Sequence, residues 1–376
     1  MKTQRRIFDL RNSLLWSLAL LTALSFSACS NDDDDKKGEF NEDITGAYIL
    51  NYGTYSMGGA SVTRYDFRND KVTNEYFENQ NPGMTLYSNI QYGAEYNNNI
   101  YIVGNVTDEL ITFDLHFRPT GNAVRTGLEI PRYYVGKGDY LYISCYGNDG
   151  YDTDMANSYI AVYSIENRKV EEKITVPGGP EGLAIVGNKL YASLGFSPKI
   201  AVIDLDSHDV DYIDIPSVSS YLQQDKDGNL YATLISTWTD PSESTGLAYI
   251  NTTEDKLEAT YSLDGISTSY GNILSANKDL STLYVCAASW VEDTPGNWVQ
   301  KGAIWAFDTE SREFEEFASG LTGVQGVCVN PFTNDVYVML GISAIEAGEV
   351  SIYDPSGNLF KTIEVGISPY WILFLE

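Results

Sequence analysis

The chain has 376 residues, and its 24 basic and 52 acidic side chains give a formal net charge of -28 at pH 7. Nucleic-acid binding requires a basic face, so this charge excludes nucleic acid as a partner and disfavours polyanionic ligands. Hydrophobic residues make up 43% of the chain and aromatic residues 13%. That is enough for a packed core, so a disordered acidic chain is excluded as well.

Residues 1–28 have the composition of an export signal. Four basic side chains within the first eleven residues precede the apolar run 14–28. This run is shorter than the roughly 20 residues that a membrane-spanning helix needs and is typical of a secretory signal. It ends at Ala28-Cys29, which resembles a bacterial lipobox, so we expect Cys29 to be lipidated. An ordinary signal peptide with a nearby cysteine, or a twin-arginine signal, stays open as an alternative.

Residues 29–43 are predicted to be a flexible tether. The run Asp32 to Asp35 follows Cys29 closely, and a run of like charges stays solvated. Its position resembles the acidic export signal of surface lipoproteins in Bacteroidota-type bacteria. This resemblance implies a lipid-anchored protein of the outer membrane that is exposed at the cell surface. The alternative is a plain spacer on a periplasmic lipoprotein.

One strand motif recurs seven times after residue 44. In each copy a tyrosine stands between two hydrophobic residues, and successive copies lie 40 to 53 residues apart. The seven tyrosines are Tyr48, Tyr101, Tyr142, Tyr191, Tyr231, Tyr284 and Tyr337. A repeat of this length that contains several strands indicates a β-propeller.

Each tyrosine strand has neighbours in the sequence that complete a four-stranded unit. A second apolar strand follows and ends in a residue that opens turns by bonding its own backbone. These residues are Asp66, Asp114, Ser164, Asp204, Asn251, Asp308 and Asp354. Outer strands are expected at 72–77, 170–176, 210–215, 257–263 and 359–365, and an inner strand precedes each tyrosine except the first.

The predicted fold is therefore all-β, a seven-bladed β-propeller with four antiparallel strands per blade over residues 44–376. The first unit lacks an inner strand, and the segment 367–376 is an unpaired strand of the inner type. We expect the C-terminal strand to close the ring inside the first blade, because closure leaves no exposed inner edge.

Aromatic residues are concentrated on one predicted face. Loops that join second to third strands, and loops that join blades, share this face. Together with the starts of the inner strands they carry 11 of the 28 Tyr residues and, after the export signal, every Trp except Trp305. These types supply rigid contact area at binding sites. The candidate ligand-binding residues are Tyr92, Arg132, Tyr133, Glu181, Tyr221, Trp238, Tyr270, Trp290, Trp298, Gln325 and Tyr370. Packing between blades remains the alternative for the aromatic residues, and a structural salt bridge for Arg132 with Glu181.

We expect no enzyme, no catalytic residue, no cofactor and no metal site. Glu181 enters a central strand without an equivalent carboxylate in another blade, whereas a glycosidase needs a pair. Neither G-x-S-x-G nor H-E-x-x-H occurs. The Asp-rich segment 148–154 offers oxygen ligands for Ca²⁺ but lacks EF-hand spacing. Cys145, Cys286 and Cys328 are predicted to be free, buried thiols.

The repeat beginning Pro180-Glu181-Gly182-Leu183-Ala184 resembles those of YncE-like, surface-layer-type propellers. The segment 46–53 resembles the start of the Bacteroidota lipoprotein branch of that family, which contains the BtuG-like group. Proteins of this group capture vitamin B12 at the cell surface and cover a TonB-dependent transporter. The resemblance implies a corrinoid as the small-molecule ligand and an outer-membrane TonB-dependent transporter as the partner. The alternatives are a glycan- or siderophore-binding partner of another transporter, a protein-binding scaffold, and a hydrolase.

Overall fold

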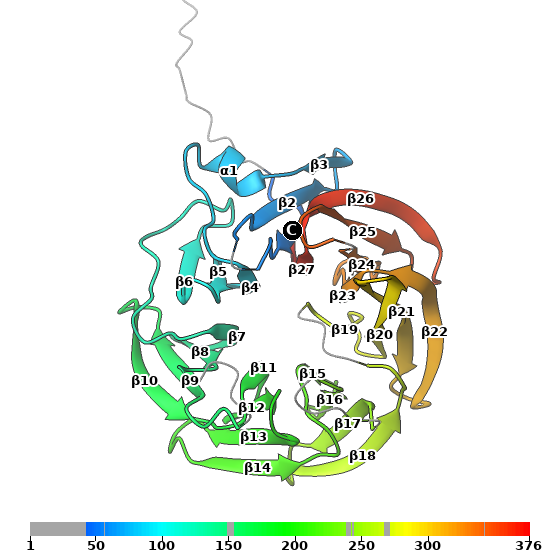
Figure 1. Cartoon of the computed structure of the whole chain (residues 1–376). Helices are drawn as coiled ribbons and strands as arrows, with labels where there is room; N and C mark the ends of the chain where they lie inside the picture. Colours follow the sequence, from blue (N-terminus) through cyan, green and yellow to red (C-terminus); the bar gives the residue numbers. More distant parts are fainter. Residues whose placement is uncertain are drawn as a thin grey trace, which may run out of the picture. The chain divides into compact units, whose positions relative to one another are not determined.

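The computed structural model describes residues 43–376 except 56, 149–153, 238–241, 243, 267–270 and 342. Residues 43–376 form one compact unit. It consists of seven antiparallel sheets, which Figure 1 shows arranged around a ring. Six sheets have four strands, and the sheet β4-β5-β6 has three. The predicted seven-bladed propeller is confirmed, and the predicted Cys29 and residues 1–42 lie outside the described residues.

The inner strands line the centre of the ring (Figure 1). They are β27 (Pro369–Leu375), β4 (Ile90–Tyr96), β7 (Pro131–Lys137), β11 (Pro180–Val186), β15 (Leu222–Gln224), β19 (Leu274–Ala276) and β23 (Val324–Val329). In this order, which we number as blades 1 to 7, each inner strand contacts the next, and β23 contacts β27. The inner strands therefore form a closed circle.

The second strands carry the repeated tyrosines. They are β1 (Gly46–Asn51), β5 (Asn99–Gly104), β8 (Tyr140–Cys145), β12 (Lys189–Leu194), β16 (Leu230–Leu234), β20 (Thr282–Thr294) and β24 (Val336–Leu340). All seven tyrosines are buried, with at most 6% of their surface exposed. A second strand lies between two neighbours in its own sheet and between two neighbouring blades, so its side chains pack on both faces.

The third strands end at the predicted turn residues. They are β2 (Ser61–Asp66), β6 (Glu109–Phe113), β9 (Tyr159–Ser164), β13 (Lys199–Asp204), β17 (Gly246–Asn251), β21 (Asn297–Asp308) and β25 (Ala347–Tyr353). In every blade the side chain of the turn residue accepts hydrogen bonds from backbone N–H groups two to four positions further on. The turns predicted from these residues are confirmed.

The outer strands depart most from the prediction. They are β3 (Lys71–Thr73), β10 (Lys169–Thr175), β14 (Val210–Asp214), β18 (Lys256–Ser262), β22 (Glu313–Thr322) and β26 (Leu359–Ile367). In blade 1 the strand expected at 72–77 is cut short, and α1 (Tyr76–Gln80) begins within it. Tyr76 and Phe77 are both buried, and adjacent side chains of a strand would point to opposite faces. In blade 2 the outer edge is reduced to the bridges Leu110–Val124 and Phe113–Pro119.

The ring closes as predicted, because β27 pairs with β1 in an antiparallel ladder from Gly46–Leu375 to Asn51–Pro369. Blade 1 thus combines both ends of the described chain. Cys145, Cys286 and Cys328 are free and buried, as expected. Burial raises the pKa of the Cys145 and Cys286 thiols to about 12 and that of Cys328 to about 11. In the described part of the chain, no helix is long and apolar enough to cross a membrane.

Candidate functional site

Five of the seven inner strands have a β-bulge next to their first residue. In β7, Pro131 pairs with Cys145 and Tyr133 with Ser144, so Arg132 between them is skipped by the ladder. The same shift occurs in four other blades. The residues that follow the first strand position there are Gln91, Glu181, Gln325 and Tyr370. A bulge re-aims the side chain that it skips.

Four of the candidate residues occupy this position in their strands, and a fifth candidate, Tyr92, does not. Arg132, Glu181, Gln325 and Tyr370 occupy the bulge. Tyr92 does not occupy it, because Tyr92 is paired with Val103 and the bulge residue of β4 is Gln91. The motif Pro-X at 131–132, 180–181 and 369–370 is the sequence signal that could have placed Gln91 correctly, since Ile90 stands where these three strands have proline.

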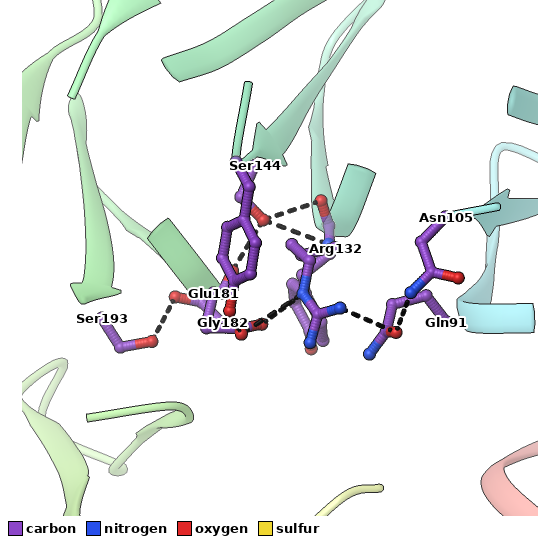
Figure 2. Close-up of polar contacts among 9 residues, drawn as sticks. Gln91, Asn105, Arg132, Ser144, Glu181, Gly182 and Ser193 are labelled. Atoms are coloured by element: carbon purple, nitrogen blue, oxygen red, sulfur yellow. Dashed lines mark hydrogen bonds and ion pairs between the residues drawn. The ribbon is translucent and has the colours of Figure 1, made fainter. Parts of the chain in front are cut away.

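Three bulge residues from consecutive blades form a polar arc (Figure 2). Arg132 Nη1 donates to Gln91 Oε1 at 3.0 Å. Arg132 Nε lies 3.2 Å and 3.1 Å from the two carboxylate oxygens of Glu181. Asn105 Nδ2 donates to the same Gln91 oxygen at 3.0 Å. The arc therefore links blades 2, 3 and 4 through side chains, and the predicted Arg132–Glu181 salt bridge is present.

The arc is buried beneath a tyrosine from the loop after β8. The guanidinium carbon of Arg132 lies 4.7 Å from the ring centroid of Tyr146, a cation–π geometry, and the Tyr146 hydroxyl donates to Glu181. Arg132 is only 4% exposed and Glu181 16%. Burial raises the pKa of the Glu181 carboxyl, and the charge of Arg132 acts against this rise. A buried charge needs such partners to remain ionised.

An aromatic floor fills the channel next to the arc. We use this name for Tyr92, Tyr133, Tyr221 and Trp371, which come from four different blades. Tyr92 stacks on Tyr133 with ring centroids 3.8 Å apart and meets Trp371 edge to face at 4.6 Å. Trp371 also stacks on Tyr221 at 6.2 Å. Rings from blades 1 and 5, on opposite parts of the circle, therefore approach each other at this depth.

The aromatic floor keeps surface for a ligand. Tyr92 is buried, whereas Tyr133, Tyr221 and Trp371 are each half-buried. Burial raises the pKa of Tyr133 to about 12 and raises those of Tyr92 and Tyr221 well above the ordinary value. All three phenols therefore stay neutral hydrogen-bonding groups at physiological pH. Trp371 is one of the aromatic residues expected on this face but is absent from the candidate ligand-binding residues, because its contacts with the other rings arise only on ring closure.

Close approach of neighbouring blades requires glycine beside the arc. Gly182 N donates to Ser220 O of the next blade at 2.8 Å, and a Cβ atom on Gly182 would lie 2.6 Å from that oxygen. Ser144 Oγ donates across the same kind of boundary, to Glu181 O at 2.7 Å. Figure 2 shows Ser144, Glu181 and Gly182 side by side. Together these bonds fix the depth of the Glu181 side chain.

The remaining predicted residues are not all part of this cluster. Tyr370 stacks on Tyr52 with centroids 4.4 Å apart, so it packs at the rim. Gln325 is half-buried and lies against Gly341, where a Cβ would approach its amide to 2.6 Å. Trp298 lies on β21 and is 57% exposed. Trp238 and Tyr270, and the side chain of Trp290, lie outside the described residues.

A hydroxyl-rich cavity of about 540 Å³ lies where loops of blade 5 meet the β20–β21 hairpin of blade 6. Its lining combines hydroxyl groups, one carboxylate and one apolar side chain: Ser236, Ser242, Thr245, Asp264, Gly265, Ile266 and Ser289. Its volume falls within the range of small-molecule sites. The described residues that line it include a carboxylate and no basic side chain, a lining that suits a neutral or cationic ligand. The sequence places the predicted Trp238 and Trp290 within the same two loops.

The described residues contain no group of three or more His, Cys, Asp or Glu side chains placed to hold a metal ion. Of the Asp-rich segment considered for Ca²⁺, residues 149–153 fall outside the described part.

Solved structures share the fold at low sequence identity. A quinonprotein alcohol dehydrogenase-like protein from Bacteroides thetaiotaomicron aligns with a TM-score of 0.65 and 13% identity, over 89% of this chain and 79% of its own. The periplasmic gluconolactonase PpgL of Pseudomonas aeruginosa aligns with a TM-score of 0.63 and 16% identity, over 88% and 99%. A putative 6-phosphogluconolactonase from Bacteroides uniformis aligns with a TM-score of 0.63 and 13% identity, over 89% of this chain and 100% of its own. At these identities the likeness shows the fold alone.

No curated protein matches the sequence. A family model matches residues 45–372, which include every blade of the ring. The chain therefore belongs to the family described as Domain of unknown function (DUF5074).

Proposed function

We propose that this protein captures a small molecule on the aromatic face of the propeller and passes it to a TonB-dependent transporter. One observation carries the first half: rings from four blades meet across the channel while Tyr133, Tyr221 and Trp371 keep part of their surface exposed. Such a floor provides apolar contact area with hydroxyl groups at its border, the usual composition of a ligand site.

The charge distribution favours a ligand without net negative charge. The one buried cation of the arc, Arg132, is already paired with Glu181, and the cavity at blades 5 and 6 adds Asp264 and several hydroxyls. The whole chain carries a formal charge of -28. A corrinoid meets this requirement, because it is large, has no net negative charge and is rimmed by amides that can bond hydroxyl and carboxylate groups.

The location and the partner in this proposal rest on the sequence. The apolar run that ends at Cys29 and the following aspartates support a lipid anchor in the outer membrane and exposure at the cell surface. The resemblance to BtuG-like propellers supports the corrinoid and the transporter. A glycan- or siderophore-binding role on the same face is the second candidate, favoured by the hydroxyl-rich cavity.

The proposal assigns no catalysis to the arc. Both carboxylate oxygens of Glu181 are bound by Arg132, and one also accepts from Tyr146. A carboxylate held this way is poorly placed to act as a base or nucleophile. The lactonases among the structural neighbours share only the fold. A Glu181→Gln variant that loses lactone-hydrolysing activity, measured against an active wild type, would overturn this assignment.

Equilibrium dialysis with cyanocobalamin tests the ligand. We expect saturable binding of one molecule per chain at micromolar protein or below. A Trp371→Ala variant should bind at least about tenfold more weakly, because ~1.4 kcal/mol of lost aromatic contact corresponds to this factor. An absence of retention at micromolar wild-type protein rejects the corrinoid, and a panel of neutral glycans and siderophores then tests the second candidate.

A further inference from the structure

Six large apolar side chains stand exposed along three consecutive blades, 7, 1 and 2. We call them the apolar crest: Tyr55, Met57, Met84, Tyr87, Val106 and Ile345, each between 41% and 80% exposed. They belong to the β24–β25 loop, the β1–β2 loop, the connection from α1 to β4, and the β5–β6 loop. The β1–β2, β5–β6 and β24–β25 loops share the face of the aromatic floor, because each joins a second to a third strand. The connection from α1 to β4 reaches these loops at Ser88 and Asn89.

Hydrogen bonds tie the loops that carry the crest to one another. Thr54 Oγ1 donates to Ala344 O at 2.6 Å and so joins blade 1 to blade 7. Asn89 Nδ2 donates to the backbone oxygens of Tyr52 and Thr54 at 2.8 Å and 3.1 Å and joins blade 1 to blade 2. Ser88 Oγ accepts from the backbone N–H of Val106 at 3.3 Å.

The anchors of these loops are buried, whereas the crest side chains are not. Asn89 is fully buried and Ser88 is 4% exposed. The loops are therefore fixed from beneath and present their apolar side chains in a set arrangement. Apolar side chains exposed as a group mark an interaction site rather than ordinary surface. Prior fixation lowers the entropy that a partner must overcome on binding.

The charge of the crest segments restricts which kind of partner can bind to the apolar crest. The crest segments 51–60, 74–89, 105–108 and 341–346 contain Glu75, Glu78, Asp108 and Glu346, and no Lys or Arg. A second copy of this chain would bring like charges together, and an anionic lipid or nucleic-acid surface would be repelled. Apolar side chains bordered by carboxylates are complementary to a protein surface on which apolar residues are bordered by Lys and Arg.

We propose that the apolar crest is the docking surface for a protein partner with a basic-rimmed apolar patch. The partner would lie beside the channel mouth, because Tyr52 of the β1–β2 loop stacks on the rim residue Tyr370 at 4.4 Å. This inference rests on the proposed function in one respect: docking would serve the transfer of a captured ligand to a transporter. The docking itself does not depend on which ligand binds.

Photocrosslinking in the cells that make the full-length protein tests the proposal. A photoreactive amino acid is placed at Met57 or Tyr87, and as controls at Tyr140 or Phe332, which are exposed apolar residues outside the crest, at turns between first and second strands. We expect both crest positions to give an adduct with the same protein, identified by mass spectrometry. The contacted segment of that protein should contain Lys or Arg, and the control positions should not give the adduct.

Two variants then separate docking from folding and from ligand binding. We expect the triple change Tyr55→Ser, Met57→Ser and Tyr87→Ser to lower adduct yield from a probe at Ile345 at least about tenfold, as loss of apolar contact predicts. Glu346→Lys, tested with a probe at Tyr87, should lower the adduct yield severalfold. Both variants should keep the wild-type urea midpoint and the wild-type affinity for cyanocobalamin. The proposal would be overturned if the crest probes give no adduct, or adducts only with lipid or with another copy of this chain. It would also be overturned if the control positions give the same adduct in equal yield.

Discussion

Arg132 Nε is shared between the two carboxylate oxygens of Glu181, at 3.2 Å and 3.1 Å, across the boundary between blades 3 and 4. Both residues are skipped by the ladder at the bulge of their inner strands. A local feature of strand pairing, repeated around the ring, therefore brings side chains of successive blades together at the channel mouth. Removing one charge of such a pair leaves the other buried without compensation.

We predict that Arg132→Met lowers the free energy of unfolding by about 3–5 kcal/mol, whereas the double variant Arg132→Met/Glu181→Leu recovers most of this loss. The deficit of the single variant should also shrink as the pH falls. Burial raises the folded-state pKa of Glu181, so the folded protein binds this proton more readily than the unfolded chain, and protonation removes the uncompensated charge. Urea unfolding followed by circular dichroism at several pH values checks both statements. An equal loss of unfolding free energy in the single and double variants would contradict energetic coupling between Arg132 and Glu181.

A substitution at Gly182 tests whether the close approach of blades 4 and 5 requires glycine. We predict that Gly182→Ala costs about 1–3 kcal/mol, because the added carbon overpacks a fixed backbone contact and displaces the bond from Gly182 N to Ser220 O. Gly195→Ala is the matched control in the same blade, because its Cβ would meet its nearest neighbour at 3.4 Å. Similar urea midpoints for the two variants would show that the blades can separate at Gly182 without cost.

The turn aspartates predict how the fold responds to acid. Hydrogen bonds from Ser207, Ser311 and Asn358 lower the pKa values of Asp204, Asp308 and Asp354. A carboxyl whose pKa is lower in the folded state stabilises the fold above its unfolded pKa, and the contribution is lost as the pH falls through the folded value. The triple Asp→Asn variant should therefore be less stable than the wild type near neutral pH, and the difference should shrink as the pH falls through the unfolded and then the lowered folded pKa values of these carboxyls. A difference that is constant with pH would contradict this origin.

Ring closure gives a further test. β1 is buried along its whole length and pairs with β27, so truncation after Ser368 exposes one edge of a central strand. We expect the truncated chain to lose cooperative unfolding and to aggregate, because an open apolar edge pairs with other chains. Removing only the exposed Glu376 is the control and should leave the urea midpoint unchanged. A truncated chain that remains monomeric and unfolds cooperatively would show that closure is dispensable.

The sequence predicts the blades well, because the features that define them are local. Tyr48 and its six counterparts mark buried second strands, and residues such as Asp204 mark the turn after each third strand. Both signals depend on neighbours within a few positions. The prediction of an outer strand at 72–77 in blade 1 is wrong, because that segment depends on contacts with another blade. Its residues Tyr76 and Phe77 turn into a helix to bury both rings, and Phe77 meets Phe113 of blade 2 at 5.7 Å.

The site could be predicted only in part, because it depends on register and on contacts between blades. A one-residue bulge moves the mouth position from Tyr92 to Gln91, and a shift of one residue reverses the direction of a side chain. Tyr146 covers Arg132 from a loop of its own blade, where no strand pattern fixes its orientation. Trp371 joins the aromatic floor only after the C-terminal strand has entered blade 1.

The most direct test of ligand capture at the aromatic floor is a comparison of cyanocobalamin binding by wild type and Trp371→Ala in equilibrium dialysis. Tyr212→Ala, an exposed change on the outer strand β14, serves as the control for a general effect of aromatic loss. We expect saturable binding by the wild type and by the control, with an affinity at least about tenfold lower for Trp371→Ala. Equal affinity of all three proteins, or no binding by the wild type, would contradict capture of a corrinoid at this floor.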